Sequence, residues 1–413
     1  MSPDTGFFIP HLPAILLAAT PTSLSLPLLL LLIFGVAKLF ANVCERFGQP
    51  GIVGEILAGV VLGPSVLNWV QPDHLLHALA EMGVLFLLFR VGLEVKASDL
   101  MRVGGTALLV ACVGVALPFA AGWAIMYAAG GSNVETIFVG AALTATSVGI
   151  TAQVLASRGW LQARASQVIL AAAVIDDILG LLILSLVSSV AEGHVNLEAL
   201  ATTGVIAFGF MILVASYGAR TMQQIIPRVE RRLKVQEGQF TLAMVLLFAL
   251  ALLAVYAGVA AIVGAFLAGM ALSEAVTPRV HDLTHGVTEL LLPFFLAGIG
   301  LHVELSVFSD RPTLELAVAV CVLAIFSKLI ACGLGAFRLG RGDMLRVGVG
   351  MIPRGEVGMV VAQIGLSLGV VEERVYAIVV LMAIVTTLVA PPLLKIAYRS
   401  SRPGIPEQKF TLA

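Results

Sequence analysis

The sequence predicts an all-α polytopic membrane protein of about thirteen transmembrane helices, with inverted-topology repeats and two crossing discontinuous helices. Three observations predict this fold: the composition, the distribution of basic residues between apolar runs, and an internal repeat. Of the 413 residues, 59% are hydrophobic and 12% are charged, and the mean hydropathy is +1.03. Soluble chains are about 45–50% apolar and about 25% charged. Most of this chain must therefore face lipid, and its net charge of −1 gives no basis for binding nucleic acid.

Thirteen apolar runs approach or exceed the roughly 20 residues that a helix needs to cross the hydrocarbon core. They lie near residues 24–45, 51–67, 78–95, 105–129, 134–157, 165–190, 198–222, 238–257, 258–275, 286–303, 313–337, 345–369 and 374–398. The runs are continuously apolar rather than alternating, which is typical of helices and not of a transmembrane barrel. We expect residues 1–23 to be an extracytoplasmic lead, residues 24–400 to be the transmembrane domain, and residues 401–413 to be a cytoplasmic tail.

Basic residues are distributed very unevenly between the two sides of the predicted membrane domain. The loops after odd-numbered runs and the C-terminal tail contain 18 of the 24 Lys and Arg residues. The N-terminal lead and the loops after even-numbered runs contain two, and four lie inside runs. By the positive-inside rule the odd-numbered loops and the C-terminus are cytoplasmic, and the N-terminus is outside. The most basic loop, 220–237, is predicted to be a solvated cytoplasmic connector.

The chain contains an internal repeat. GEILAGVVLG (54–63) recurs as GAFLAGMALS (264–273), and LFRVGLEV (88–95) recurs as LAGIGLHV (296–303). Both recurrences have an offset close to 209 residues and follow the same order along the chain. The first copy begins at the second run and the second copy begins at the ninth. Because a shift of seven helices reverses orientation, the repeats are predicted to be inverted.

The predicted repeats cover residues of about 51–190 and 258–398, and linker helices near 198–257 join them. Inverted repeats with a binding site near the bilayer midplane are typical of secondary transporters, which build that site from interrupted helices. The sequence therefore predicts a transporter whose site lies where corresponding helices of the two repeats are broken.

Two runs at matching positions contain residues that weaken helices. TATSVGIT (144–151) lies in the fifth run and MIPRGEVGM (351–359) in the twelfth, again about 209 residues apart. Pro353 lacks a backbone donor and clashes with the preceding helical turn. Gly149, Gly355 and Gly358 are also unfavourable in a helix interior. We expect both runs to be discontinuous helices whose freed carbonyls and hydroxyl groups are open to ligands.

AAAVIDDILGLLIL (171–184) places Asp176 and Asp177 side by side in an apolar run. Each acid at the centre of a membrane helix costs roughly 2.5–3.5 kcal/mol on insertion scales. Neighbouring helix positions point about 100° apart, so the two carboxylates are predicted to have different roles. One would face the ion path while the other pairs with Lys328, whose ammonium favours the ionised carboxylate.

Four polar residues are predicted to share the middle of the membrane. Asp176 and Thr146 each lie twelve residues from a basic cytoplasmic end, or about 18 Å along a helix. Lys328 and Glu356 each lie ten residues from such an end, or about 15 Å. A carboxylate at this depth that binds either a proton or a cation is the minimum that antiport requires. A purely structural ion pair is the alternative, but it leaves the second aspartate unexplained.

These residues resemble a known family. VIDDILGL, ATSVGITAQVL, IFSKLIACGLGAF, GMIPRGEVGMVVA and AIVGAFLAG resemble the bacterial monovalent cation:proton antiporters, second family, in its two-aspartate electrogenic sodium/proton branch. The resemblance covers about residues 24–398. It implies the sodium/proton antiporter fold and a homodimer in a bacterial inner (plasma) membrane. Each subunit would have a dimerisation domain and a mobile core domain that works by elevator-like alternating access, serving pH homeostasis and sodium tolerance.

The resemblance also implies roles for individual residues. Asp177 is the ion- and proton-binding acid, and Asp176 is the partner of Lys328. Thr146 and Ser147 lie at the unwound crossing of the first broken helix.

Arg354 and Glu356 belong to the second broken helix, where the resemblance implies that they balance half-helix dipoles. Asp177 and Asp176 are the expected ligands of Na⁺, which is cargo. We expect no catalytic residue and no resident cofactor. The expected partners are Na⁺ or Li⁺, with K⁺ as the alternative cation, together with protons and membrane lipid.

Two other functional hypotheses are a K⁺/H⁺ antiporter on the same fold and a non-transport protein such as an intramembrane protease or a channel. Potassium-efflux relatives carry Gln-Asp in place of Asp-Asp and often a soluble nucleotide-binding domain; this chain has neither feature, which favours the sodium branch over a K⁺/H⁺ antiporter. An intramembrane serine protease needs a Ser–His pair within the membrane, but the seven His residues lie in loops or at the ends of runs. A channel does not need a central Asp–Lys pair. The sequence therefore predicts a transporter and not an enzyme.

Overall fold

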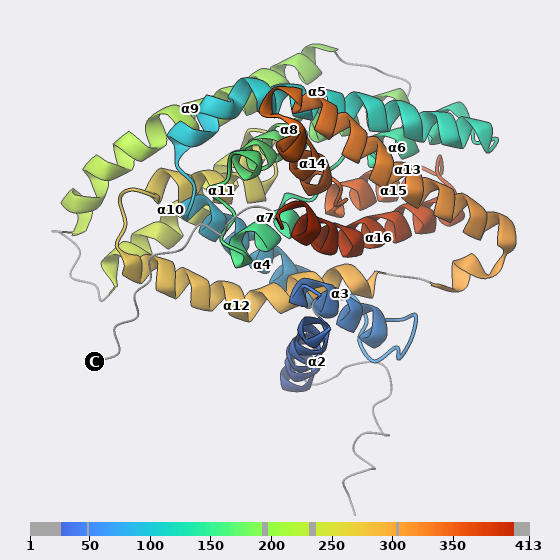
Figure 1. Ribbon diagram of the computed structural model, residues 1–413, viewed down its shortest axis with the longest axis horizontal. Helices are drawn as coiled ribbons and strands as arrows, with labels where there is room; N and C mark the ends of the chain where they lie inside the picture. The colour runs from blue at the N-terminus through green and yellow to red at the C-terminus, as the bar shows by residue number, and fades with distance from the viewer. Residues whose placement is uncertain (1–25, 48, 192–196, 231–236, 303–304, 400–413) are drawn as a thin grey trace, which may run out of the picture.

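The computed structural model describes residues 26–47, 49–191, 197–230, 237–302 and 305–399, and within these ranges it is all-helical, with no strand (Figure 1). The predicted lead, 1–23, and the predicted tail, 401–413, lie outside the described residues. Fifteen α-helices are present in the described part. In the first half they are α2 (Leu26–Arg46), α3 (Gly51–Leu62), α4 (His74–Leu93), α5 (Ala97–Ala128), α6 (Asn133–Ala142), α7 (Val148–Ser157), α8 (Arg164–Ala191) and α9 (Leu197–Glu230). In the second half they are α10 (Gly238–Tyr256), α11 (Ala261–Leu272), α12 (Pro278–Leu301), α13 (Arg311–Gly335), α14 (Arg341–Gly350), α15 (Glu356–Ser367) and α16 (Glu373–Ala397).

The helices correspond one to one with the thirteen predicted spans when each broken span is counted once. Among the described residues, nine helices are long and apolar enough to cross a membrane. The run near 134–157 is divided into α6 and α7, and the run near 345–369 is divided into α14 and α15. The all-α polytopic fold with two discontinuous helices is therefore confirmed.

Several helices extend beyond the apolar runs that predicted them. Both α5 and α12 begin eight residues earlier than expected, and α9 continues to Glu230. The prediction of a connector over 220–237 is thus wrong for its first eleven residues, which are helical. Apolarity marks only the part of a helix that lies in lipid, whereas backbone hydrogen bonding continues into the polar region. Residues 231–236 of this segment lie outside the described residues.

The helices pack as two groups. In the first group α4 packs against α11 and α12, α3 packs against α2 and α12, and α10 packs against α11. In the second group α5 packs against α6, α8 and α13, and α16 packs against α13, α14 and α15. The long helix α9 contacts α11 in one group and α8 in the other. In the second group α7 also packs against α8 and α16, and the two groups touch where α4 meets α7 and where α3 meets α16.

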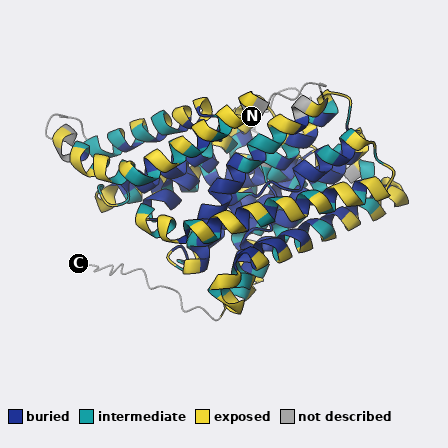
Figure 2. Ribbon diagram, turned by 90° about the horizontal axis from the view of Figure 1, so that it is seen from above, coloured by how far each residue is buried: buried dark blue, intermediate teal, exposed yellow. Residues whose placement is uncertain are grey.

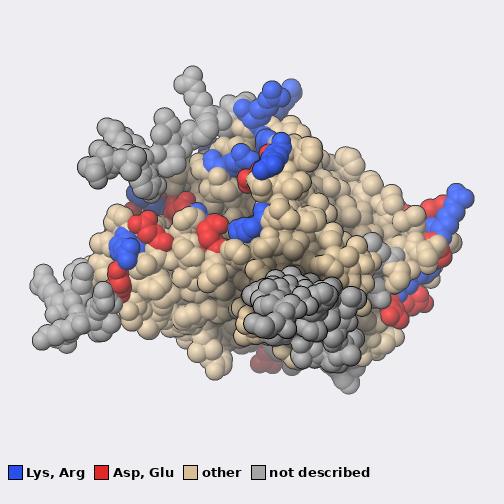
Figure 3. Space-filling model, turned by 90° about the horizontal axis from the view of Figure 1, so that it is seen from below, with Lys and Arg blue, Asp and Glu red and all other residues tan. Residues whose placement is uncertain are grey.

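Exposed residues lie on the outward faces of the long helices, and buried residues lie between the helices (Figure 2). Many exposed residues are large and apolar, including Val205, Leu213 and Tyr256. Figure 3 shows a broad surface without charged side chains, between a group at the right-hand end and more numerous ones over the left-hand half. An uncharged belt between charged ends is the surface that a bilayer requires.

Glycines allow the closest helix contacts in the first group. At four of them an added Cβ would collide with the backbone of the facing helix. These contacts are Gly59 with Ala297, Gly300 with Ile56, Gly269 with Phe89, and Gly92 with Phe266. Gly269 follows Gly59 by 210 residues, and Ala297 follows Phe89 by 208. The packing of α3 on α12 thus recurs in the packing of α11 on α4 at the offset of the sequence repeat. This recurrence supports the predicted repeat, whose inverted topology stays a prediction.

Candidate functional site

The two broken helices meet at their breaks. Residues 143–147 separate α6 from α7, and residues 351–355 separate α14 from α15. The backbone N–H of Ser147 in the first break donates a hydrogen bond to the carbonyl of Pro353 in the second, at 2.8 Å. A Cβ on Gly355 would lie only 2.8 Å from Cβ of Ser147. The two non-helical segments are therefore in direct contact, and glycine is required for this contact.

The three glycines that were expected to weaken the helices differ in their positions. Gly355 lies in the second break as expected, but Gly149 and Gly358 are inside α7 and α15, so the expectation that these two interrupt the helices is wrong. An added Cβ on Gly358 would lie 2.8 Å from the carbonyl oxygen of Ala142, and one on Gly149 would lie 3.2 Å from Val84. Both glycines serve close packing, a use that the sequence does not distinguish from helix breaking.

Arg354 satisfies carbonyl groups at the crossing. Its Nη1 donates to the carbonyl of Ala145 at 3.2 Å, and its Nη2 donates to the carbonyl of Ala324 in α13 at 3.1 Å. The side chain is 1% exposed. Helix breaks leave backbone acceptors without intrahelical donors, and each unsatisfied group in lipid costs several kcal/mol. Arg354 thus supplies donors to the first break from the second.

Threonines that the sequence analysis did not single out hold the second break in place. Thr386 Oγ1 accepts a hydrogen bond from the N–H of Arg354 at 3.1 Å, and Thr387 Oγ1 donates to its carbonyl at 3.1 Å. Thr151 of α7 donates to the carbonyl of Gly350, the last residue of α14, at 2.6 Å. The adjacent threonines in the apolar α16 are the only sequence signal that we find for this role.

A buried ion pair lies one helical turn away from the Arg354 contact on α13. Lys328 Nζ is 3.2 Å from Oδ2 and 3.3 Å from Oδ1 of Asp176, and both side chains are fully buried. Gly114 of α5 leaves room for this pair, because its added Cβ would lie 3.6 Å from Nζ of Lys328. The structure thus contains the pairing of Asp176 with Lys328 that the resemblance implied, whereas depth along the helices did not decide which aspartate pairs with Lys328.

The remaining predicted site residues lie in α8, in the first break and at the start of α15. Asp177 follows Asp176 in α8 and is 5% exposed. Thr146 is buried in the first break, and among the described residues its Oγ1 has no hydrogen-bond partner. Glu356 is the first residue of α15, and its side chain lies outside the described part. The arrangement places oxygen ligands and a buried ion pair at a helix crossing, where a cation and a proton can compete for a carboxylate.

Comparison with known proteins identifies the family. Residues 28–399 match the family described as "Sodium/hydrogen exchanger, transmembrane". The chain belongs to the sodium/hydrogen exchanger family. It is 32% identical over 369 residues to the Na⁺/H⁺-K⁺ antiporter GerN of Bacillus cereus, covering 87% of this chain and 93% of that one. It is 32% identical to the high-affinity Na⁺/H⁺ antiporter NhaS3 of Synechocystis, with 90% of each chain covered.

The fold of this exchanger is shared with a solved structure. The sodium proton antiporter MjNhaP1 of Methanocaldococcus jannaschii matches with a TM-score of 0.63 over 90% of this chain and 95% of that one. The sequence identity is 18%, so this likeness speaks for the fold alone. Together with family membership it confirms the predicted class, a multi-pass cation:proton antiporter that is a transporter and not an enzyme. The two-aspartate branch stays a prediction.

Proposed function

We propose that this exchanger moves Na⁺ or Li⁺ against H⁺ across a bacterial inner membrane by alternating access. The observation that carries the proposal is the fully buried Asp176–Lys328 pair next to Asp177, beside the crossing of two broken helices. Ionisable groups this deep in a membrane are expensive and mark ion paths and proton relays. The names of the relatives GerN and NhaS3 support sodium and proton as substrates.

In this proposal Asp177 binds the cation and the proton alternately. Carboxylate and hydroxyl oxygens suit hard cations, and Thr146 and Ser147 supply hydroxyl groups at the first break. A cation bound to the carboxylate excludes the proton, and a proton removes the negative charge that holds the cation. Exchange follows because the carboxylate carries one ligand or the other to each side.

The Asp176–Lys328 pair makes exchange electrogenic in this proposal. A single carboxylate that trades one proton for one Na⁺ moves no net charge. A second ionisable unit that gains and loses a proton in the same cycle adds one proton to each turnover. The pair is the second such unit beside Asp177, so one Na⁺ would exchange for more than one proton.

The proposal includes a homodimer with its N-terminus outside and its C-terminus in the cytoplasm. The orientation rests on the 18 basic residues of the predicted cytoplasmic segments. The first group of helices, which contains α3, α4, α11 and α12, would be the stationary domain. The second group, which contains both broken helices, would be the domain that moves. Native mass spectrometry of the purified protein checks the dimer.

Transport in proteoliposomes tests the function. Addition of Na⁺ or Li⁺ to vesicles with an acidic interior should release the proton gradient, and an imposed inside-negative potential should change the rate. If no added cation dissipates the proton gradient, antiport is contradicted. If the rate does not depend on the membrane potential, electrogenic exchange is contradicted. K⁺/H⁺ exchange is the second candidate because the relative GerN is named an Na⁺/H⁺-K⁺ antiporter. Equal dissipation of the proton gradient by K⁺ would favour it.

A further inference from the structure

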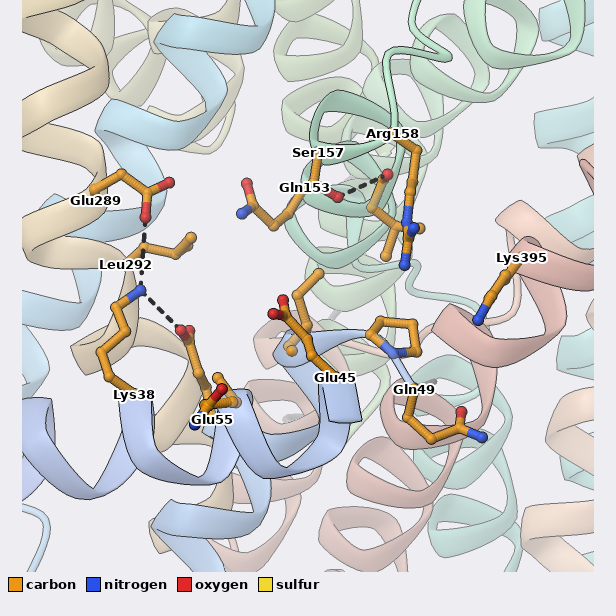
Figure 4. A pocket seen from close by; sticks show the side chains of 16 residues that line it. Lys38, Glu45, Gln49, Glu55, Gln153, Ser157, Arg158, Glu289, Leu292 and Lys395 are labelled. Carbon is orange, nitrogen blue, oxygen red and sulfur yellow. Dashed lines mark hydrogen bonds and ion pairs between the residues drawn. The ribbon is translucent and has the colours of Figure 1, made fainter. Parts of the chain in front are cut away.

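A polar cavity of about 670 Å³ lies between the two groups of helices (Figure 4). One wall carries Lys38 of α2, Glu55 of α3 and Glu289 of α12, and the other wall carries Gln153 of α7. At about 30 Å³ per molecule of liquid water, the cavity has room for about 20 waters. The rim at Arg158 belongs to a loop that the charge distribution assigns to the cytoplasmic side.

Lys38 joins two carboxylates on the first wall. Its Nζ lies 2.9 Å from Oε1 of Glu55 and 3.5 Å from Oε2 of Glu289. Glu55 is 5% exposed, whereas the side chains of Lys38 and Glu289 are 35% and 45% exposed. Two acids thus share one ammonium at the cavity wall, and the deeper acid is buried.

Two oxygen atoms at this cavity lack partners. Within the described residues, Oε2 of Glu55 and Oε1 of Gln153 are buried and accept no hydrogen bond. Gln153 is 8% exposed, and Figure 4 shows its amide end directed toward the wall that carries Glu289 and Lys38. A buried acceptor without a donor costs about 1–3 kcal/mol. Both atoms are acceptors, so the group that satisfies them is a donor or a cation.

We propose that Glu55 and Gln153 form an outer site for a monovalent cation, which holds the cation in the cavity before it reaches Asp177. Carboxylate and amide oxygens, together with water, are the ligands that hard cations take. The two unpartnered oxygens on facing walls carry this assignment, and not an excess of negative charge, since Nη1 of Arg90 lies 3.7 Å from Oε1 of Glu289 and gives the second acid a cation of its own. The proposal rests on the cation exchange proposed above and adds a second site to it.

Lys38 acts as an internal competitor for this site. Its ammonium already contacts the Glu55 carboxylate that the cation would use, so the cation binds more weakly while Lys38 stays in place. Removal of Lys38 should strengthen cation binding. If the cluster were purely structural, removal of Lys38 should not strengthen cation binding. It should instead impair the protein, because it leaves a buried acid without its counter-charge.

Because the two walls belong to different helix groups, the site is complete only when the groups stand as they do in this structure. A shift of α7 relative to α3 would separate Gln153 from Glu55. The outer site therefore serves one side of the membrane, the side on which the cavity opens.

Transport kinetics test the site in the native chain. In vesicles with Na⁺ supplied on the cavity side, Glu55→Gln and Gln153→Leu should raise the KM for Na⁺ about tenfold with kcat unchanged. Lys38→Gln should lower it, and Glu45→Gln, which removes an exposed acid of the same cavity, should leave it unchanged. A KM that rises in Lys38→Gln, or that stays native in both Glu55→Gln and Gln153→Leu, overturns the proposal.

Equilibrium binding of ²²Na⁺ to purified protein separates this site from the main one. Asp177→Asn should keep a weak component that a further Gln153→Leu substitution removes and Glu45→Gln does not. If the native chain exchanges Na⁺ for H⁺ but Asp177→Asn binds no ²²Na⁺, the outer site is overturned and the proposed function stands. Absence of both binding and exchange in the native chain overturns both. Because Gln153 and Glu55 lie on opposite walls, misfolding of one variant leaves the other to decide.

Discussion

Asp176 and Asp177 are adjacent in α8, and Asp176 contacts Lys328 in the ion pair described above. Successive helix residues point about 100° apart, so one side chain cannot replace the other. The buried ammonium of Lys328 neutralises Asp176, whereas Asp177 lies at 5% exposure in the same turn. Our proposal therefore gives cargo binding to Asp177 and the second proton-exchanging unit to the pair.

Asp177→Asn should abolish exchange and leave the protein folded. An amide neither releases a proton at working pH nor offers a charged oxygen to a cation. Because the substitution removes one buried acid, the melting temperature should hold or rise slightly. Vesicle exchange assays and thermal melts measure the two effects, with the exposed Asp282→Asn as the matched control. Native exchange in the Asn variant would show that Asp177 is not the binding acid.

The Asp176–Lys328 pair should show coupling in a double-mutant cycle. Lys328→Ala leaves a buried acid without its counter-charge, at about 3–5 kcal/mol when no proton is taken up. The variant should melt lower and carry less charge per cycle. Asp176→Asn combined with Lys328→Gln should regain stability but not the current.

Thermal melts and solid-supported-membrane currents of the two single variants and the double variant measure this coupling. Additive melting shifts with undiminished currents in all three would mean that the residues act independently. The cycle thus separates a working pair from two neighbouring but unrelated charges.

Among the elements, the two broken helices show what the sequence can and cannot predict. Pro353 and the hydroxyl-rich TATSVGIT segment located both breaks, because residues that disrupt helix hydrogen bonding leave a local signal. The glycines were an uneven guide, since Gly355 lies in the second break, whereas Gly149 and Gly358 pack against neighbours inside helices. The bond from Arg354 to Ala145 spans 209 residues, and no local pattern predicts which carbonyl a buried Arg reaches.

Gly355→Ala should disturb the crossing. The added Cβ would lie 2.8 Å from Cβ and 3.0 Å from Oγ of Ser147, and overpacking of this kind costs about 1–3 kcal/mol. The melting temperature and the exchange rate should both fall. A second substitution, Ser147→Gly, removes the facing Cβ and should restore stability.

Gly35→Ala in α2 is the matched control for this substitution. A Cβ on Gly35 meets nothing within 4 Å, so its melting temperature should stay native or rise. If Gly355→Ala melts like the native protein, the two breaks are not in the close contact that the structure shows.

At the scale of the whole molecule, hydropathy predicted the number of spans, because each span must be apolar wherever it packs. The division into two helix groups was not predictable from the same signal. Which helix faces which depends on contacts such as Gly59 with Ala297, whose partners are more than 200 residues apart. The repeat gave a partial guide, since the same contact recurs between α11 and α4.

The orientation of the molecule can be tested with single cysteines. In a background without Cys44, Cys112, Cys321 and Cys332, one cysteine is placed at Gln223 and another at Ser309, both exposed in the structure. Three spans, α10 to α12, separate these positions, so they should lie on opposite faces of the membrane. The proposed orientation puts Gln223 in the cytoplasm, because basic residues lie near it. An impermeant maleimide should therefore label Ser309→Cys on intact cells, and Gln223→Cys only in inverted vesicles or after detergent. Labelling of both positions from the same side would contradict three membrane crossings between them. Labelling of Gln223→Cys on intact cells would reverse the proposed orientation, and the polar cavity would then open on the opposite side of the membrane.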